Sequence, residues 1–143
     1  MKKLNVLISP ILMVLMCAAL SQAQQITISI NKIIPNQMIC GSISGLSAQD
    51  YKKYKVIVYV HTDQWYIHPY AGQGDGKSWA SIQPDGGWQI QTVQRDFKAD
   101  KVAAILVSKE NYAEPSKIES LERIQKSSIV VKELQGTNDY GSL

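Results

Sequence analysis

The chain has 143 residues, a formal charge of +3 and 45% hydrophobic residues, which suits one domain with a core that needs no metal or disulfide. Charged residues make up only 19% of it, which excludes a highly charged disordered protein.

Residues 1–23 have the features of a secretory signal. Lys2 and Lys3 precede an apolar run over residues 4–20, and small residues precede a cleavage position after Ala23. A retained membrane anchor is the alternative, because the run is about long enough to span a bilayer. A lipid on Cys17 would need a small residue before it, where Met16 stands instead. The sequence therefore predicts export to the periplasm, the cell envelope or the exterior, with a lipoprotein as the lesser alternative.

Cleavage would leave a chain that is almost neutral. Lys2 and Lys3 leave with the signal, so 13 basic residues face 12 acidic ones, a balance that does not favour nucleic acid as a partner. Cys40 would then be the sole cysteine, which excludes an intrachain disulfide. Because it lies in an apolar stretch, we expect a buried and inert thiol.

Short runs of alternating or β-branched residues follow one another after the signal. They predict strands at residues 25–30, 38–43, 55–62, 65–70, 79–82, 88–93, 102–107 and 128–132. Turn residues separate several of these runs, with Asp63 and Gln64 as a tight hairpin and residues 84–87 as a proline–glycine turn. The run 55–62 is apolar on both faces, which is typical of a central strand that is covered on both sides. Pro69 cannot donate to a ladder, so the run 65–70 should lie at an edge or end there.

One helix is expected near the C-terminus. Ile118, Leu121 and Ile124 have helical spacing, and Ser116 with Glu119 would form a capping box. Residues 136–143 are polar and are expected to form a flexible tail. The fold prediction is therefore an all-β domain over residues 24–135, an immunoglobulin-like β-sandwich with one short helix near the C-terminus.

Several of these segments resemble those of a known class of modules. The segments are residues 41–45, 54–59, 82–88, 102–107 and 128–132, together with Ala99, Tyr112 and Pro115. In this order they resemble small β-sandwich accessory modules of secreted bacterial proteins, often appended to glycoside hydrolases. The resemblance implies the sandwich fold and a carbohydrate-binding or interaction role, although turn glycines and strand cores imply fold more than function. A helper role for a tethered enzyme is not expected, because this chain carries no catalytic domain beside the module.

Aromatic residues gather in one part of the sequence. Eight of the eleven lie within residues 51–88. Sugars stack their C–H faces on flat rings and need planar polar partners for their hydroxyls. Strand alternation puts Tyr66, His68 and Tyr70 on one face, and Ile67 identifies the other face as core. We therefore expect an exposed row with help from Trp79 and Gln73, and the predicted ligand-binding residues are Trp65, Tyr66, His68, Tyr70 and Trp79.

The alternative for this aromatic set is that the rings only cover the sandwich. Trp88 opens a clean amphipathic strand and is expected in the core.

Other chemistries find weak support in the sequence. Residues 71–78 nearly match a phosphate-binding loop, but such a loop must lead into a helix, and the run 79–82 predicts a strand. Turn chemistry explains the loop aspartates at positions 63, 75, 85, 96 and 100, so no glycosidase pair is expected. His61 and His68 have no further ligands in register for zinc, and no calcium-loop spacing occurs. We expect no catalytic residue, metal, cofactor or nucleotide.

The sequence thus predicts a non-catalytic binding module with a polysaccharide or other glycan as its partner. The alternative is a protein–protein interaction or structural module of the envelope, in which the same aromatic residues form the interface.

Overall fold

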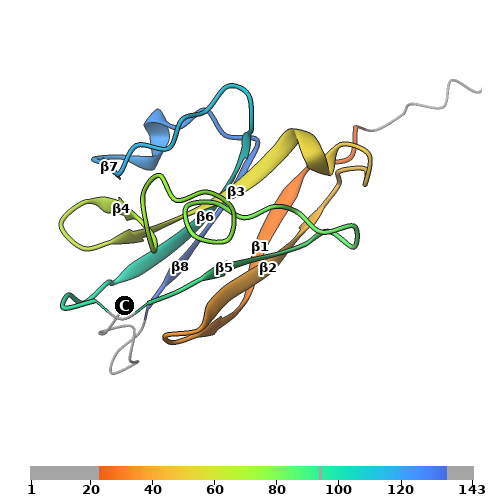
Figure 1. Ribbon diagram of the computed structural model, residues 1–143. Coiled ribbons are helices and arrows are strands. Elements are labelled where there is room, and N and C mark those ends of the chain that lie inside the picture. Colours follow the sequence, from red (N-terminus) through yellow and green to blue (C-terminus); the bar gives the residue numbers. More distant parts are fainter. Residues whose placement is uncertain (1–22, 94, 135–143) are drawn as a thin grey trace, which may run out of the picture.

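The computed structural model describes residues 23–93 and 95–134. The predicted signal at 1–23, except Ala23, and the predicted tail at 136–143 lie outside the described residues. Two antiparallel sheets make up the described part, with almost no helix, so the all-β prediction is confirmed. The same residues contain no helix that is long and apolar enough to cross a membrane. Figure 1 shows the two sheets stacked as layers.

The smaller sheet has three strands in the order β1-β2-β5, which are β1 (Thr27–Ile34), β2 (Met38–Ser44) and β5 (Gly87–Gln91). Strands β1 and β2 form a hairpin whose turn contains Asn36 with a positive φ of 58°. Alternation in each strand sends one set of side chains toward the larger sheet. The inward set is apolar and comprises Ile28, Ile30, Ile39, Ile43, Trp88 and Ile90.

The larger sheet has five strands in the order β7-β4-β3-β6-β8. They are β3 (Tyr54–His61), β4 (Trp65–Ile67), β6 (Lys101–Ser108), β7 (Lys117–Ile118) and β8 (Ser128–Glu133). A three-residue 3-10 helix, η1 (Tyr51–Lys53), leads into β3. Six consecutive residues of β3 and of β6 are buried, which confirms the expectation of a central strand covered on both sides for residues 55–62.

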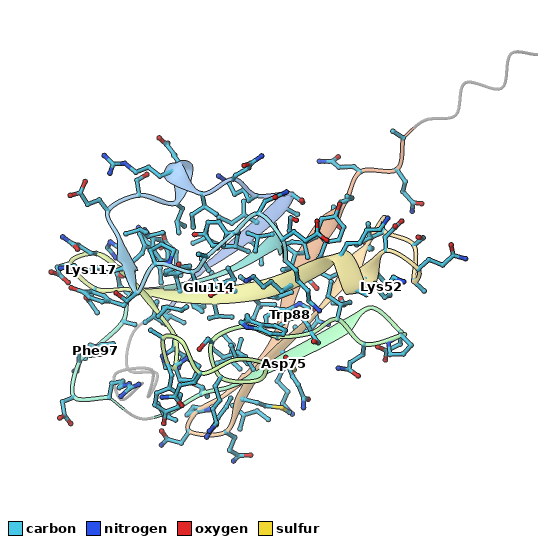
Figure 2. All side chains as sticks on the ribbon, turned by 45° about the horizontal axis from the view of Figure 1, so that its top comes forward. Lys52, Asp75, Trp88, Phe97, Glu114 and Lys117 are labelled. Atoms are coloured by element: carbon cyan, nitrogen blue, oxygen red, sulfur yellow. The ribbon has the colours of Figure 1, made fainter. Side chains whose placement is uncertain are left out.

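Each face of the larger sheet packs against a separate apolar cluster. The cluster between the sheets includes Val56, Val58, Val60 and Trp88, which confirms the core position predicted for Trp88. The cluster on the outer face includes Ile57, Tyr59, Trp65 and Ile67. Figure 2 shows Trp88 within the molecule, between the ribbons of the two sheets.

A strap over residues 109–127 covers the outer face and contains the region where a helix was expected. Ile118 instead lies in β7, where it pairs with Trp65 of β4, and the only helical turn described there is the 3-10 helix η2 (Leu121–Arg123). The capping residue is Ser120, whose hydroxyl accepts from the N–H of Glu122. The helix prediction is wrong because the apolar residues reach their core through strand pairing, and Ile118, Leu121 and Ile124 still contact the outer cluster.

The connection from β4 to β5 also pairs with β3. Residues 79–82 were expected to form a strand, and the structure gives three isolated bridges there, through Trp79, Ala80 and Ile82. Ala80 and Val56 exchange two backbone hydrogen bonds of 2.7 and 2.9 Å. Two segments, β4 and the bridge at Ala80, therefore share one edge of β3. The chain between them, residues 68–79, forms a loop at the margin of the sandwich (Figure 1).

Candidate functional site: an aromatic groove at the margin of the sandwich

The five predicted ligand-binding residues do not form one exposed row. Trp65 is 8% exposed and His68 only 1%, whereas Tyr66, Tyr70 and Trp79 are half-buried. Ile67 lies in the outer cluster, as expected, and Trp65 lies there beside it. The expected exposure of His68 is wrong, because the small sheet and its connections cover the second face of this strand as well.

His68 is held inside the structure by polar contacts. Its backbone N–H donates to the carbonyl of Val58 at 2.9 Å, and its Nε2 lies 2.6 Å from the hydroxyl oxygen of Thr92, which is also buried. Burial lowers the pKa of His68 from 6.5 to about 4, and the positive charge of Arg95 is the second cause. The imidazole is therefore neutral at pH 7 and links β4 to the end of β5.

The low pKa of His68 predicts a pH-dependent stability. Between pH 6.5 and 4 the unfolded chain binds a proton at His68 that the folded chain does not, so the free energy of unfolding falls as the pH is lowered through this window. The full loss would be roughly 3 kcal/mol. Urea unfolding at pH 7.5 and pH 5 should show a smaller difference for His68→Gln than for the wild type. An equal pH dependence in both proteins would contradict the neutral buried imidazole.

Three of the predicted residues, Tyr66, His68 and Tyr70, line a surface groove of about 350 Å³. His68 contributes to its wall, together with residues on the loop that follows and on the segment after β5. The described lining consists of Tyr66, Ile67, His68, Pro69, Tyr70, Ala71, Gln73, Arg95, Phe97 and Ser116. Gln73 was expected beside the aromatic row, and the structure places it there. The groove therefore combines three partly exposed rings with an amide and a guanidinium.

Arg95 and Phe97 were missed by the sequence reasoning. The guanidinium carbon of Arg95 lies 5.1 Å from the centre of the Tyr70 ring, and its Nη2 donates to the carbonyl of Pro69. Phe97 is 37% exposed and presents part of its ring to the groove. Both residues lie more than twenty positions from Tyr70 in sequence, so only the fold shows that they share a groove with it.

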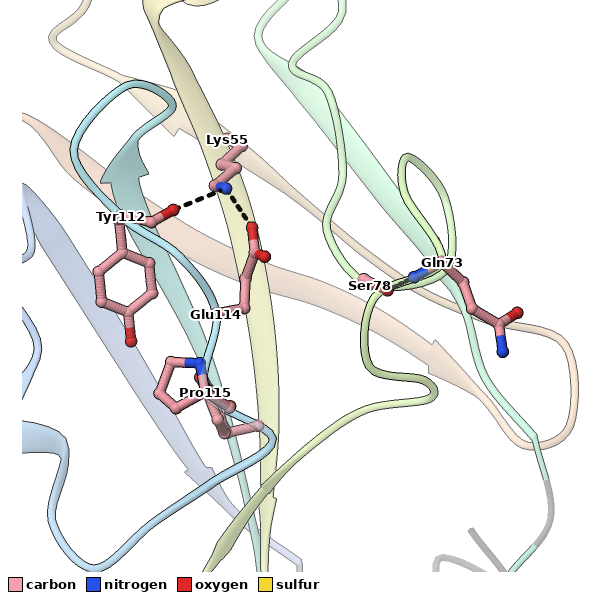
Figure 3. Close-up of polar contacts among 7 residues, drawn as sticks. Lys55, Gln73, Ser78, Tyr112, Glu114 and Pro115 are labelled. Atoms are coloured by element: carbon pink, nitrogen blue, oxygen red, sulfur yellow. Dashed lines mark hydrogen bonds and ion pairs between the residues drawn. The ribbon is translucent and has the colours of Figure 1, made fainter.

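The glycine-rich loop forms one side of the groove and is closed by its own hydrogen bonds. The N–H groups of Gly76 and Ser78 donate to the carbonyls of Trp79 and Gly74, at 2.7 and 2.8 Å. The N–H of Gln73 donates to the Ser78 hydroxyl at 2.6 Å, as Figure 3 shows. These N–H groups are engaged within the loop, and the next element is β5 and not a helix, so the loop differs from a phosphate-binding loop.

Trp79 lies apart from the groove. It packs against the outer cluster, with the Nζ atoms of Lys55 and Lys109 at 5.8 and 5.2 Å from its ring centre. Lys55 is buried and forms an ion pair with Glu114 of the strap, and its Nζ also donates to the carbonyl of Tyr112 at 3.0 Å (Figure 3). This cluster ties the strap to β3, so the geometry gives Trp79 a packing role.

A second hollow, also of about 350 Å³, lies on the other side of the glycine-rich loop. Its described lining is Gln37, Met38, Gly76, Gln89, Ile90 and Gln91. It offers amides for hydrogen bonding but no ring for stacking, so the aromatic groove is the stronger candidate site.

Cys40 on β2 is half-buried and so less enclosed than expected. Within the described residues, no group of three histidine, cysteine or acidic side chains could hold a metal ion.

Comparison of the chain with protein-family models, curated proteins and solved structures finds no match. The function is therefore inferred from the groove itself.

Proposed function

We propose that the protein is a non-catalytic binding module whose ligand is carbohydrate, bound in the aromatic groove. The observation that carries the proposal is the joint exposure of Tyr66, Tyr70 and Phe97 in one groove beside Gln73 and Arg95. Partly exposed rings offer flat apolar faces for the C–H groups of a sugar. The planar amide and guanidinium can donate to its hydroxyls in fixed directions.

The absence of acidic side chains from the described lining supports a binding role without catalysis. Glycoside hydrolysis requires two carboxyl groups held at a fixed separation on either side of the scissile bond. Among the described residues that line the groove there is no aspartate or glutamate, and its histidine is buried and neutral. The groove offers binding contacts without the acid and base pair.

The proposal also includes export of the protein and an immunoglobulin-like sandwich fold. The signal features of residues 1–23 support delivery to the periplasm, the envelope or the exterior, where polysaccharides are available. The two stacked antiparallel sheets support an immunoglobulin-like sandwich of the accessory-module type. In such a sandwich, loops at the margin carry the ligand contacts, and the groove lies on the loop 68–79 and the segment after β5.

A protein–protein interface is the second candidate. Tyrosine, phenylalanine and arginine are enriched at interfaces, and Phe97 exposes apolar surface beside Tyr70 and Arg95. If the groove is a protein interface, removal of its rings would change the oligomeric state of the protein, and the wild type itself would bind no glycan.

A glycan-array screen of wild type and of the double variant Tyr66→Ala/Tyr70→Ala tests the proposal. We expect at least one class of glycan to bind the wild type and to bind the variant at least tenfold more weakly, about 1.4 kcal/mol, because two stacking surfaces are lost. Trp79→Leu is the matched control, since it removes an aromatic ring outside the groove, and it should bind like the wild type. Absence of binding to every glycan, together with a shift of the double variant on size exclusion, would favour the protein interface.

A further inference from the structure

We propose that the groove is selective for acidic carbohydrate, with the guanidinium of Arg95 pairing with a carboxylate or sulfate on the sugar. This inference rests on the proposed function and specifies its ligand class. Its starting point is that Arg95 carries the formal charge of the described groove lining at neutral pH, because the His68 imidazole is neutral there.

No acidic side chain of the described residues forms an ion pair with this guanidinium. The ion pairs among the described residues join Lys53 to Asp50, Lys55 to Glu114, His61 to Asp100 and Arg123 to Glu119. Arg95 takes part in none of them, although it is half-buried. A partly buried guanidinium without a carboxylate partner is a favourable site for an anion, since much of its desolvation is already complete in the free protein.

The protein also fixes the orientation of the guanidinium. One of its nitrogen atoms donates to the carbonyl of Pro69, and its central carbon lies over the Tyr70 ring. A guanidinium has five N–H donors, so one carbonyl leaves several for a ligand. A carboxylate or sulfate can accept two parallel hydrogen bonds from such a fork, a geometry that a neutral hydroxyl cannot match.

Charged side chains of both signs lie near the groove but outside its described lining. Lys117 of β7 is exposed and pairs in register with Tyr66, and Figure 2 shows Lys117 and Phe97 at the same end of the molecule. Asp63 and Asp96 are also exposed, and like Lys117 they do not belong to the described lining. The Asp63 carboxylate accepts from the hydroxyls of Thr62 and Tyr66, at 2.8 and 3.5 Å, and so is partly engaged.

Affinity electrophoresis with matched polymers tests this selectivity. The probes are dextran and dextran sulfate, which differ only in sulfation, and polygalacturonate and its methyl ester, which differ only in carboxylate charge. We expect wild-type protein to be retarded by at least one charged polymer at least tenfold more strongly than by its neutral counterpart, with the retardation falling as NaCl is added. Comparison of the two charged polymers distinguishes carboxylate from sulfate.

Charge variants show whether the effect belongs to the groove. Arg95→Gln should lose at least tenfold in affinity for the charged polymer and keep the circular dichroism spectrum of the wild type. Lys32→Gln, which removes an exposed charge on β1, is the matched control and should bind like the wild type. If Arg95→Gln does not fold, Arg95→Lys replaces it, since it keeps the charge but loses the fork and should bind with intermediate affinity.

Several results would overturn the inference. Equal retardation by charged and neutral polymers would refute acidic selectivity but leave carbohydrate binding intact. Equal losses of affinity for the charged polymer in Arg95→Gln and Lys32→Gln would show that the polymer is attracted by the overall charge of the protein and not by the groove. Binding to phosphatidylglycerol vesicles without retardation by any polymer would point to an anionic lipid surface and refute both the inference and the proposed function.

Discussion

Replacing Gly41 by alanine is expected to unfold the smaller sheet. A Cβ atom at this position would lie 1.7 Å from the backbone carbonyl oxygen of Ser29 on β1 and 2.7 Å from Cζ2 of Trp88 on β5. Gly41 pairs with Ile30 on one side and with Trp88 on the other, so relief of the clash would require both neighbouring strands to move. We expect a loss of more than about 4 kcal/mol in the free energy of unfolding, measured in urea, or no soluble protein.

Two controls identify the backbone as the obstacle to a side chain at position 41. Gly41→Ala combined with Trp88→Leu should not recover stability, because the carbonyl of Ser29 remains in place. Gly72→Ala should cost about 1 kcal/mol, since Gly72 has a φ of +67° but a Cβ atom there would meet only open space. A Gly41→Ala protein within about 1 kcal/mol of the wild type would contradict the register of β1, β2 and β5.

The second large effect is expected at the buried ion pair beneath the strap. The side chains of Lys55 and Glu114 are 9% and 16% exposed, so Glu114→Gln would leave an ammonium group buried without its counter-charge. The expected loss is about 3 kcal/mol in the free energy of unfolding. Because the pair ties the strap to β3, hydrogen exchange of the strap over residues 109–127 should also accelerate.

Two control variants separate the effect of an unpaired buried charge from that of losing an ion pair. Lys55→Met combined with Glu114→Leu removes both charges and should fall within about 1 kcal/mol of the wild type, because an apolar pair avoids desolvation. Asp50→Asn breaks the exposed pair with Lys53 and should change stability little. A loss in the double variant as large as in Glu114→Gln would show that the pair itself, and not the unpaired charge, determines the effect.

The sequence predicted the strands best where their pattern is independent of distant partners. The sequence predicted β3 and β6 closely, because a strand buried on both faces requires a continuous run of apolar residues. It also predicted the turn that ends at Gly86, because the positive φ there favours glycine. The helix expected around Leu121 fails for the opposite reason. Its apolar spacing fits a helix as well as a strand followed by a 3-10 turn, and the pairing of Ile118 with Trp65 decides between them.

The candidate site was predicted only in part. Tyr66, Tyr70 and Gln73 were found because they are close in sequence, but alternation alone could not show that both faces of β4 are covered, so His68 was misplaced. Arg95 contacts Tyr70 in the folded structure, and no local sequence pattern predicts this contact. Trp79 is near Tyr70 in sequence but faces the outer cluster, because the loop 68–79 turns the chain back to the edge of β3 before Ala80.

The most direct test of carbohydrate binding in the groove is a map of backbone amide chemical shifts during titration with trigalacturonate and, separately, with neutral maltotriose. We expect at least one of them to shift the signals of residues 66–73 and 95–97 together, and to leave the outer surface of β1 and β2 unchanged. Shifts confined to another surface, or no shift with either sugar at millimolar concentration, would contradict carbohydrate binding at this site.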